Sequence, residues 1–182
     1  MSKNKNHSAG HKDIPLEEVR QKIDALDTQI QALISDRARL ASAVRESKGE
    51  LENAVDYYRP EREAQVLRAV CERNEGPISD AEMLRLFREI MSVCLAQQEP
   101  LKIAYLGPEG TFTQQAVHLH FGHSVQALGV TGIDDVFMQV ESTEADFGVV
   151  PVENSNQGIV SHTLDRFVDS DPVSYTHLTL PT

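Results

Sequence analysis

Two cations on the apolar side of a long predicted helix are the first residues whose types and spacing could do chemistry. Arg37 stands where an apolar residue would continue the stripe of a segment that runs from Leu16 to Lys48. A guanidinium on such a stripe is costly unless an anion meets it there. Lys48 follows eleven residues later, displaced by about 20° around the helix and about 16 Å along it. Two cations aimed the same way predict a pocket for a small polyanion within a helical bundle.

The segment that must position both cations is one long helix, with apolar residues spaced alternately three and four positions apart. This apolar stripe comprises Leu16, Val19, Ile23, Leu26, Ile30, Leu33, Leu40 and Val44. An apolar stripe only one residue wide per turn is typical of a coiled coil or of a long helix in a bundle. Two alternatives stay open: Arg37 could lie along the stripe and pair with a neighbouring carboxylate, or the segment could serve only to dimerise the chain.

Two shorter helices are predicted after this segment, at 61–74 and from Ser79 to about Gln98. Pro60 favours the start of the first, because a proline is well tolerated in the opening turn. Ser79 followed three residues later by Glu82 forms a capping box for the second. The first hundred residues therefore read as an all-α domain of three helices.

The pattern changes after Pro100 to alternating strands and helices. We predict strands at 102–106, 124–130 and 145–150, and helices at 112–120, 133–140 and 160–168. This alternation is typical of a parallel α/β domain, in which binding loops follow the carboxyl ends of the strands. Only about 70 residues of the pattern are present, which is few for a complete doubly wound domain.

Composition excludes several classes of partner. The 182 residues carry a formal net charge of -11, and only Lys102 and Arg166 among 17 basic residues lie after residue 100, so a nucleic-acid surface is not expected. No apolar run reaches membrane-spanning length, and residues 1–13 form a polar leader without the apolar centre of a signal peptide. We expect no membrane partner.

The cysteines and histidines indicate neither a disulfide nor a metal. Cys71 and Cys94 have no metal-type or disulfide-type spacing, which fits a reducing cytoplasm. His118, His120 and His123 are close in sequence, but residues 118 and 120 point to different sides of a helix. We therefore interpret them as surface or packing histidines and predict no metal site.

Six motifs resemble the bifunctional chorismate mutase–prephenate dehydratase family. They are VRQKIDALD (19–27), DRARLA (36–41), YRPERE (58–63), LFREIMSVCLAQQ (86–98), AYLGPEGTFT (104–113) and FGVVPVENSNQG (147–158). The resemblance implies an AroQ-type mutase domain at 14–99, whose three helices form an intertwined dimer. It implies that a partial α/β, periplasmic-binding-like lobe of a prephenate dehydratase follows at 101–172.

For the first domain the resemblance implies an isomerase that rearranges chorismate to prephenate in phenylalanine biosynthesis, without a cofactor. Such a site holds a dicarboxylate in a compact conformation and stabilises charge on the breaking ether oxygen. The matching positions are Arg20, Arg37 and Arg62 for the arginines, Lys48 and Gln98 for the donors to the ether oxygen, Glu63 for the hydroxyl-binding carboxylate, and Arg59 and Cys94 for further substrate contacts. Arg59 departs from relatives that carry an acidic residue there.

Helix geometry indicates that the site is shared between two chains. Arg20 precedes Arg37 by 17 residues, hence by about 25 Å along a straight helix and about a quarter-turn around it. Arg20 therefore cannot reach the pocket of its own chain, whereas an antiparallel partner helix would bring it there. The family forms such dimers, so we predict a homodimer in which Arg20 acts in trans.

The second half resembles a prephenate dehydratase, a lyase, only in part. The matching pocket residues are Thr111, Thr113, Glu153, Asn154 and Ser155. The family's TRF motif, its second lobe and its ACT domain do not occur, so we expect no dehydratase activity from this chain. Residues 173–182 (VSYTHLTLPT) do not continue the family pattern, and we interpret them as a non-native tail. A small-molecule-binding lobe without catalysis is the remaining alternative for this half.

Overall fold

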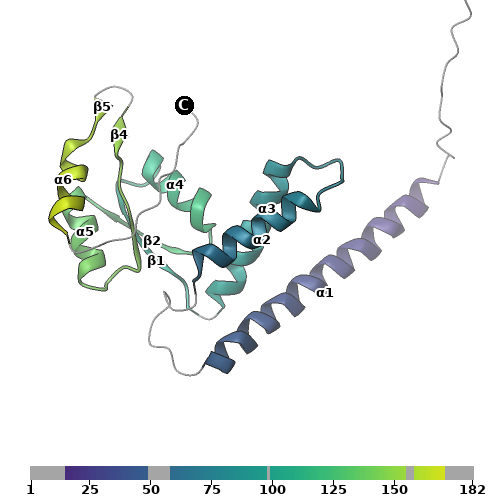
Figure 1. Ribbon diagram of the computed structural model, residues 1–182. Coiled ribbons are helices and arrows are strands. Elements are labelled where there is room, and N and C mark those ends of the chain that lie inside the picture. Colours follow the sequence, from purple (N-terminus) through teal and green to yellow (C-terminus); the bar gives the residue numbers. More distant parts are fainter. Residues whose placement is uncertain (1–14, 49–57, 98, 155–157, 171–182) are drawn as a thin grey trace, which may run out of the picture.

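The computed structural model describes residues 15–48, 58–97, 99–154 and 158–170, and it opens with the expected long helix. This helix is α1 (Leu16–Lys48), and α2 (Pro60–Glu72) and α3 (Asp80–Ala96) follow. Pro60 is the first residue of α2, and the Ser79 hydroxyl accepts a hydrogen bond from the Glu82 N–H at 3.3 Å. Both predicted helix starts are confirmed. In Figure 1, α2 and α3 lie between α1 and the sheet.

Within one chain α1 does not pack through its apolar stripe. Among the described elements it contacts only α3, and its half-buried residues include Ile34, Ala38 and Ala41. These lie about a quarter-turn around the helix from the stripe. Each residue of the apolar stripe remains 36% to 68% exposed. The stripe predicted the helix correctly, but its packing partner is not found within the described chain.

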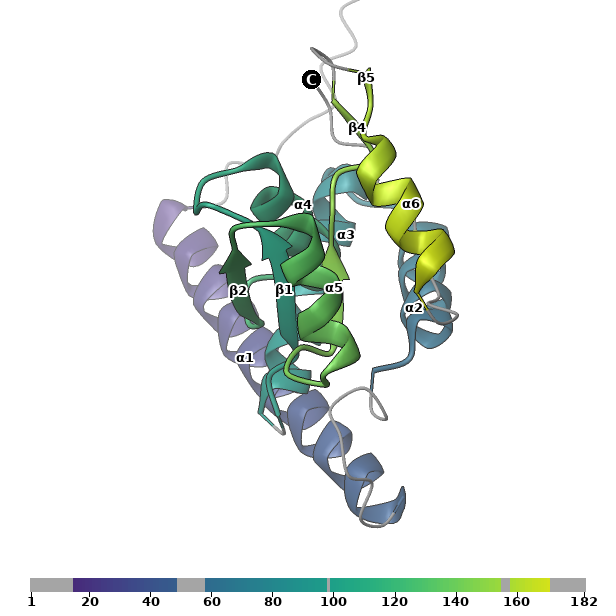
Figure 2. The same cartoon turned by 90° about the vertical axis from the view of Figure 1, so that its left-hand side faces the viewer.

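The second half contains the predicted parallel sheet. Its strands are β1 (Lys102–Leu106), β2 (Gln126–Val130) and β3 (Phe147–Val149), in the order β2-β1-β3, with every pairing parallel. The helices are α4 (Phe112–Phe121), α5 (Ile133–Glu141) and α6 (Ser161–Asp169). In Figure 2, α5 lies on the near face of the sheet and α3 lies behind it.

The central strand β1 separates two apolar cores because its successive side chains point to opposite faces of the sheet. Ala104 packs with Val136 of α5 on one face. Ile103 and Tyr105 pack with Val117 of α4 on the other. That second core also takes in two residues of the helical part, Tyr58 and Leu95, and five more of the lobe, namely Phe121, Val125, Ala127, Phe147 and Val149. The core on this face is therefore shared between the two halves of the chain.

One element differs from the sequence prediction. Residues expected as a binding loop include two very short strands, β4 (Glu153–Asn154) and β5 (Gly158–Ile159), which pair antiparallel. Two residues are too few to show a periodic pattern, so the sequence carried no strand signal here. Within the described parts of the chain, no helix combines the length and apolar character that a bilayer crossing requires.

Candidate active site

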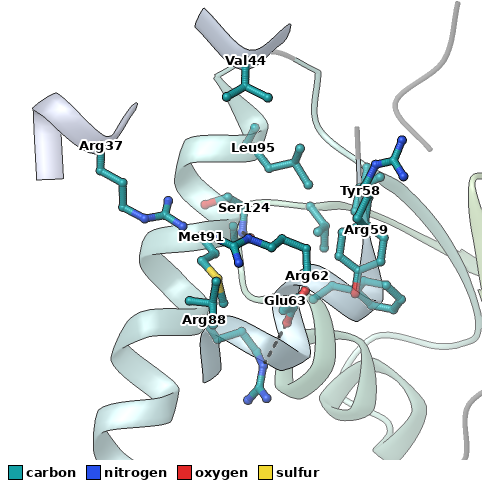
Figure 3. A pocket seen from close by; sticks show the side chains of 16 residues that line it. Arg37, Val44, Tyr58, Arg59, Arg62, Glu63, Arg88, Met91, Leu95 and Ser124 are labelled. Carbon is teal, nitrogen blue, oxygen red and sulfur yellow. Dashed lines mark hydrogen bonds and ion pairs between the residues drawn. The ribbon is translucent and has the colours of Figure 1, made fainter. Parts of the chain in front are cut away.

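A cavity of about 320 Å³ brings together four cations and one carboxylate. Its charged lining residues are Arg37 of α1, Arg59 and Arg62 at the start of α2, Glu63 of α2, and Arg88 of α3. Figure 3 shows Arg37 and Arg62 extending toward each other, whereas the end of Arg59 points away from them. A cavity with this surplus of positive charge is suited to an anion that carries more than one negative charge.

Arg37 is the lining cation that interrupts the apolar stripe of α1. It is half-buried and lines the cavity, and no carboxylate of a described residue lies within ion-pair distance of it. Arg39, two residues later, instead pairs with Asp36 on the exposed side of α1. The alternative that Arg37 pairs with a neighbouring carboxylate is therefore not seen among the described residues.

Glu63 is the acidic group of the cavity. Burial raises its pKa, while a hydrogen bond from the Tyr58 side chain and the positive charge of Arg88 oppose that rise. Arg88 Nε lies 3.7 Å from Glu63 Oε1, and the two side chains are 27% and 16% exposed. Burial also raises the pKa of the Tyr58 hydroxyl, so Tyr58 remains a neutral donor. A partly buried carboxylate of this kind can accept a hydrogen bond from a substrate hydroxyl.

Other predicted residues of the first domain are not in the described cavity. Arg20 is exposed and lies 3.9 Å from Glu17 on its own helix turn. Cys94 is 1% exposed and does not line the cavity, so its substrate contact stays a prediction. Gln98 lies outside the described residues, and so does the side chain of Lys48, although the Lys48 backbone ends α1.

Three of the five predicted residues of the second half are described: Thr111 and Thr113 follow the carboxyl end of β1, and Glu153 follows β3. The Thr111 hydroxyl donates to the Pro108 carbonyl at 2.9 Å and lies 2.9 Å from the Thr113 hydroxyl, just before and within the first turn of α4. Glu153 is exposed on β4. Ser155 and the side chain of Asn154 lie outside the described residues. The structure therefore does not test these five residues as a pocket.

Sequence reasoning missed Tyr58 and Arg88. Both belong to quoted motifs, but neither was assigned a role. Arg88 lies on the same side of α3 as Leu84 and Met91, so it interrupts a row of apolar residues as Arg37 does in α1. Tyr58 precedes its helix, and no periodic pattern marks a residue in that position.

Two families match the chain in succession. Residues 19–99 match chorismate mutase type II, and residues 103–181 match prephenate dehydratase. The second match takes in residues 173–181, most of the segment interpreted above as a non-native tail. That interpretation stays untested, because residues 171–182 lie outside the described structure.

Several relatives carry the name bifunctional chorismate mutase/prephenate dehydratase. The protein of Stutzerimonas stutzeri is 54% identical over 162 residues, covering 87% of this chain and 44% of the relative. That of Neisseria gonorrhoeae is 51% identical over 146 residues, with 80% and 39% covered. That of Escherichia coli strain K12 is 30% identical over 173 residues, with 83% and 43% covered. The chain thus spans less than half the length of these relatives. Residues 19–99 belong to the chorismate mutase type II family and residues 103–181 to the prephenate dehydratase family, in the arrangement of the bifunctional enzymes.

Proposed function

We propose that this chain rearranges chorismate to prephenate in the cavity between α1, α2 and α3. The observation that carries the proposal is the convergence of Arg37 and Arg62 on a cavity that also holds Glu63. Chorismate carries two carboxylates and a ring hydroxyl, and these groups match two arginines and a carboxylate. The two free cysteines, Cys71 and Cys94, fit a cytoplasmic location for this reaction.

The rearrangement needs no covalent intermediate, so the protein contributes orientation and electrostatic stabilisation. Arg37 and Arg62 hold the two carboxylates and favour the compact conformation in which the reacting carbons meet. Glu63 accepts a hydrogen bond from the ring hydroxyl and fixes the ring. Lys48 and Gln98 donate to the ether oxygen, where negative charge develops as its bond to carbon breaks.

The active form in this proposal is a homodimer that buries the apolar stripe of α1. Eight apolar residues at coiled-coil spacing, each at least 36% exposed, form an extended apolar surface along one helix. An antiparallel α1 of a second copy would cover this surface. It would also bring the partner's Arg20 to the cavity, which Arg20 of the same chain cannot reach.

The purified chain should consume chorismate faster than the spontaneous rearrangement, with no added metal or nucleotide. Chorismate absorbs in the ultraviolet and prephenate lacks that absorbance, so the decay can be followed directly. A chelator added at the start should leave the rate unchanged. A folded, dimeric preparation with no rate above the spontaneous background would contradict the proposed function.

Charges placed on the apolar stripe should separate the dimer. Leu26 and Ile30 are 56% and 53% exposed within one chain, so replacing both by glutamate leaves the fold of the chain largely intact. In an antiparallel pair these carboxylates would be buried against apolar side chains, which is strongly unfavourable. Light scattering after size-exclusion chromatography should show a monomer with little mutase activity.

The double variant Ala25→Glu, Ala32→Glu is the matched control for the charged stripe. It adds the same two charges to the same helix, but both alanines are exposed on a face of α1 that is turned away from the stripe and from α3. This control should remain dimeric and active. If the Leu26→Glu, Ile30→Glu double variant stayed dimeric, the stripe would not be the dimer interface.

For the second half, we propose that residues 103–181 contribute to a prephenate dehydratase site, as the family match indicates. Thr111, Thr113, Glu153, Asn154 and Ser155 are the candidate pocket residues. Parallel sheets bind ligands beyond the carboxyl ends of their strands, and this end of β1 leads to Thr111 and Thr113.

A further inference from the structure

Part of the cavity wall is formed by the α/β lobe, the described residues from 101 to 170. Phe121 at the end of α4, together with Ser124 and Val125 before β2, lines the same cavity as Arg37 and Glu63. A residue of one domain can therefore influence the site of the other through direct packing. The contacts between the lobe and the residues beside Glu63 indicate which side chain connects the two domains.

The lobe is held against α3 by a close backbone approach. Gly122 follows α4 with φ of +78°, and a Cβ added to it would lie 2.5 Å from Ser92 Cβ, so only glycine fits without a shift. The next two residues extend the contact. The His123 N–H donates to Glu89 at 3.2 Å and the Ser124 N–H donates to Ser92 Oγ at 3.3 Å. These contacts fix where the neighbouring Phe121 lies.

Phe121 in turn packs on Tyr58. The two ring centroids are 5.8 Å apart, and the ring of Phe147 on β3 contacts Tyr58 edge-on at 5.4 Å. The rings of Phe121 and Phe147 also contact each other at 5.4 Å, so the three form a closed aromatic cluster. Two of its members belong to the lobe and one to the helical domain.

The third member, Tyr58, lines the same cavity as Glu63 (Figure 3), where its hydroxyl favours the ionised carboxylate as a hydrogen-bond donor. On its other side Glu63 meets Arg88, whose buried Nε has no hydrogen-bond acceptor at bonding distance among the described residues and lies 3.7 Å from Glu63 Oε1. Tyr58 and Arg88 thus both favour the ionised form of the Glu63 carboxylate, and Tyr58 is the one of the two that packs on the aromatic side chains of the lobe.

We propose that Tyr58 is a positioning residue for Glu63, and that the α/β lobe holds it in place through Phe121 and Phe147. The catalytic consequence rests on the proposed function, in which Glu63 binds the hydroxyl of chorismate. The lobe would then determine how well the helical domain binds its substrate, even though no lobe residue contacts Glu63 in this chain of contacts.

The pH dependence follows from the groups that surround Glu63. Arg88 of α3 faces it, and the other charged lining residues are Arg37, Arg59 and Arg62. His120 of α4 lies near Arg88; burial first, and then the charge of Arg88, lowers its pKa, which favours its neutral form. Tyr58→Phe removes a hydrogen-bond donor that favours the ionised carboxylate. The effect of burial, which raises the pKa of Glu63, is then less opposed, so this pKa rises further. The ionised form then persists only at higher pH.

The test follows Glu63 directly, by the ¹³C shift of its carboxyl carbon in the glutamate-labelled full chain. The resonance is assigned by its absence in Glu63→Gln. In Tyr58→Phe the titration should move to higher pH, and in Phe121→Leu it should move the same way by less. Tyr105→Phe removes a buried hydroxyl from the lobe core, and Phe167→Leu weakens an aromatic contact with Phe137 at 5.1 Å. Both should leave the titration unchanged.

Kinetics then test the catalytic consequence. Tyr58→Phe should raise KM for chorismate about tenfold with little change in kcat, because a substrate-binding contact is weakened in the ground state and the transition state alike. The acid limb of its kcat/KM profile should move to higher pH. An unchanged Glu63 titration in both Tyr58→Phe and Phe121→Leu would overturn the inference. A shifted titration in a chain that does not consume chorismate would support the contact and overturn the proposed function instead.

Discussion

Replacing Arg37 by alanine should lower kcat/KM for chorismate by about 100-fold or more, equivalent to about 2.7 kcal/mol. Arg37 is half-buried on the cavity, and the described residues offer it no carboxylate, so its charge is available to a substrate carboxylate. Charge-assisted bonds between a guanidinium and a carboxylate are among the strongest that a side chain makes. Steady-state kinetics on purified variants measure the loss.

Arg39→Ala is the matched control for this experiment. It removes an arginine side chain from the same helix, two residues after Arg37. Arg39 is 75% exposed and paired with Asp36. An exposed pair of this kind contributes little to stability. Its kcat/KM should stay close to that of the unmodified chain. Equal losses in the two variants would show that the Arg37 effect comes from the helix and not from the cavity.

Mixing Arg20→Ala with Arg37→Ala should restore activity that neither variant has alone. If Arg20 acts in trans, a mixed dimer has one site that lacks both arginines and one site that keeps both. Random exchange at equal concentrations makes half of the dimers mixed, so about a quarter of the original activity should return. Exchange should be verified with two differently tagged chains. Proven exchange without recovery would refute the shared site.

Much of the fold could be predicted because its signals are local. Pro60 and the Ser79–Glu82 pair mark helix starts through interactions within a single turn. The alternation of strands and helices after Pro100 likewise predicted the parallel sheet. The face on which α1 packs could not be predicted, since small residues such as Ala38 and Ala41 give a weaker pattern than the apolar stripe beside them.

The candidate site was predictable where a residue contradicts its own pattern. Arg37 interrupts an apolar stripe, and that conflict led directly to the cavity. The family resemblance added Arg62 and Glu63, which the structure brings to the same cavity. Tyr58 could not be found in this way. Its importance depends on Phe121 and Phe147, which lie more than 60 residues further along the chain and approach it only after the lobe packs on α3.

The core shared across Pro100 limits how freely the two halves can be recombined by protein engineers. Cutting the chain there would separate Tyr58 and Leu95 from Ile103 and Tyr105, and would leave apolar surface on both products. A chimera that attaches the helical part to an unrelated partner must supply a matching aromatic surface, or exchange Tyr58 and Leu95 for polar residues. The junction divides the sequence between two families, but it does not divide the hydrophobic core.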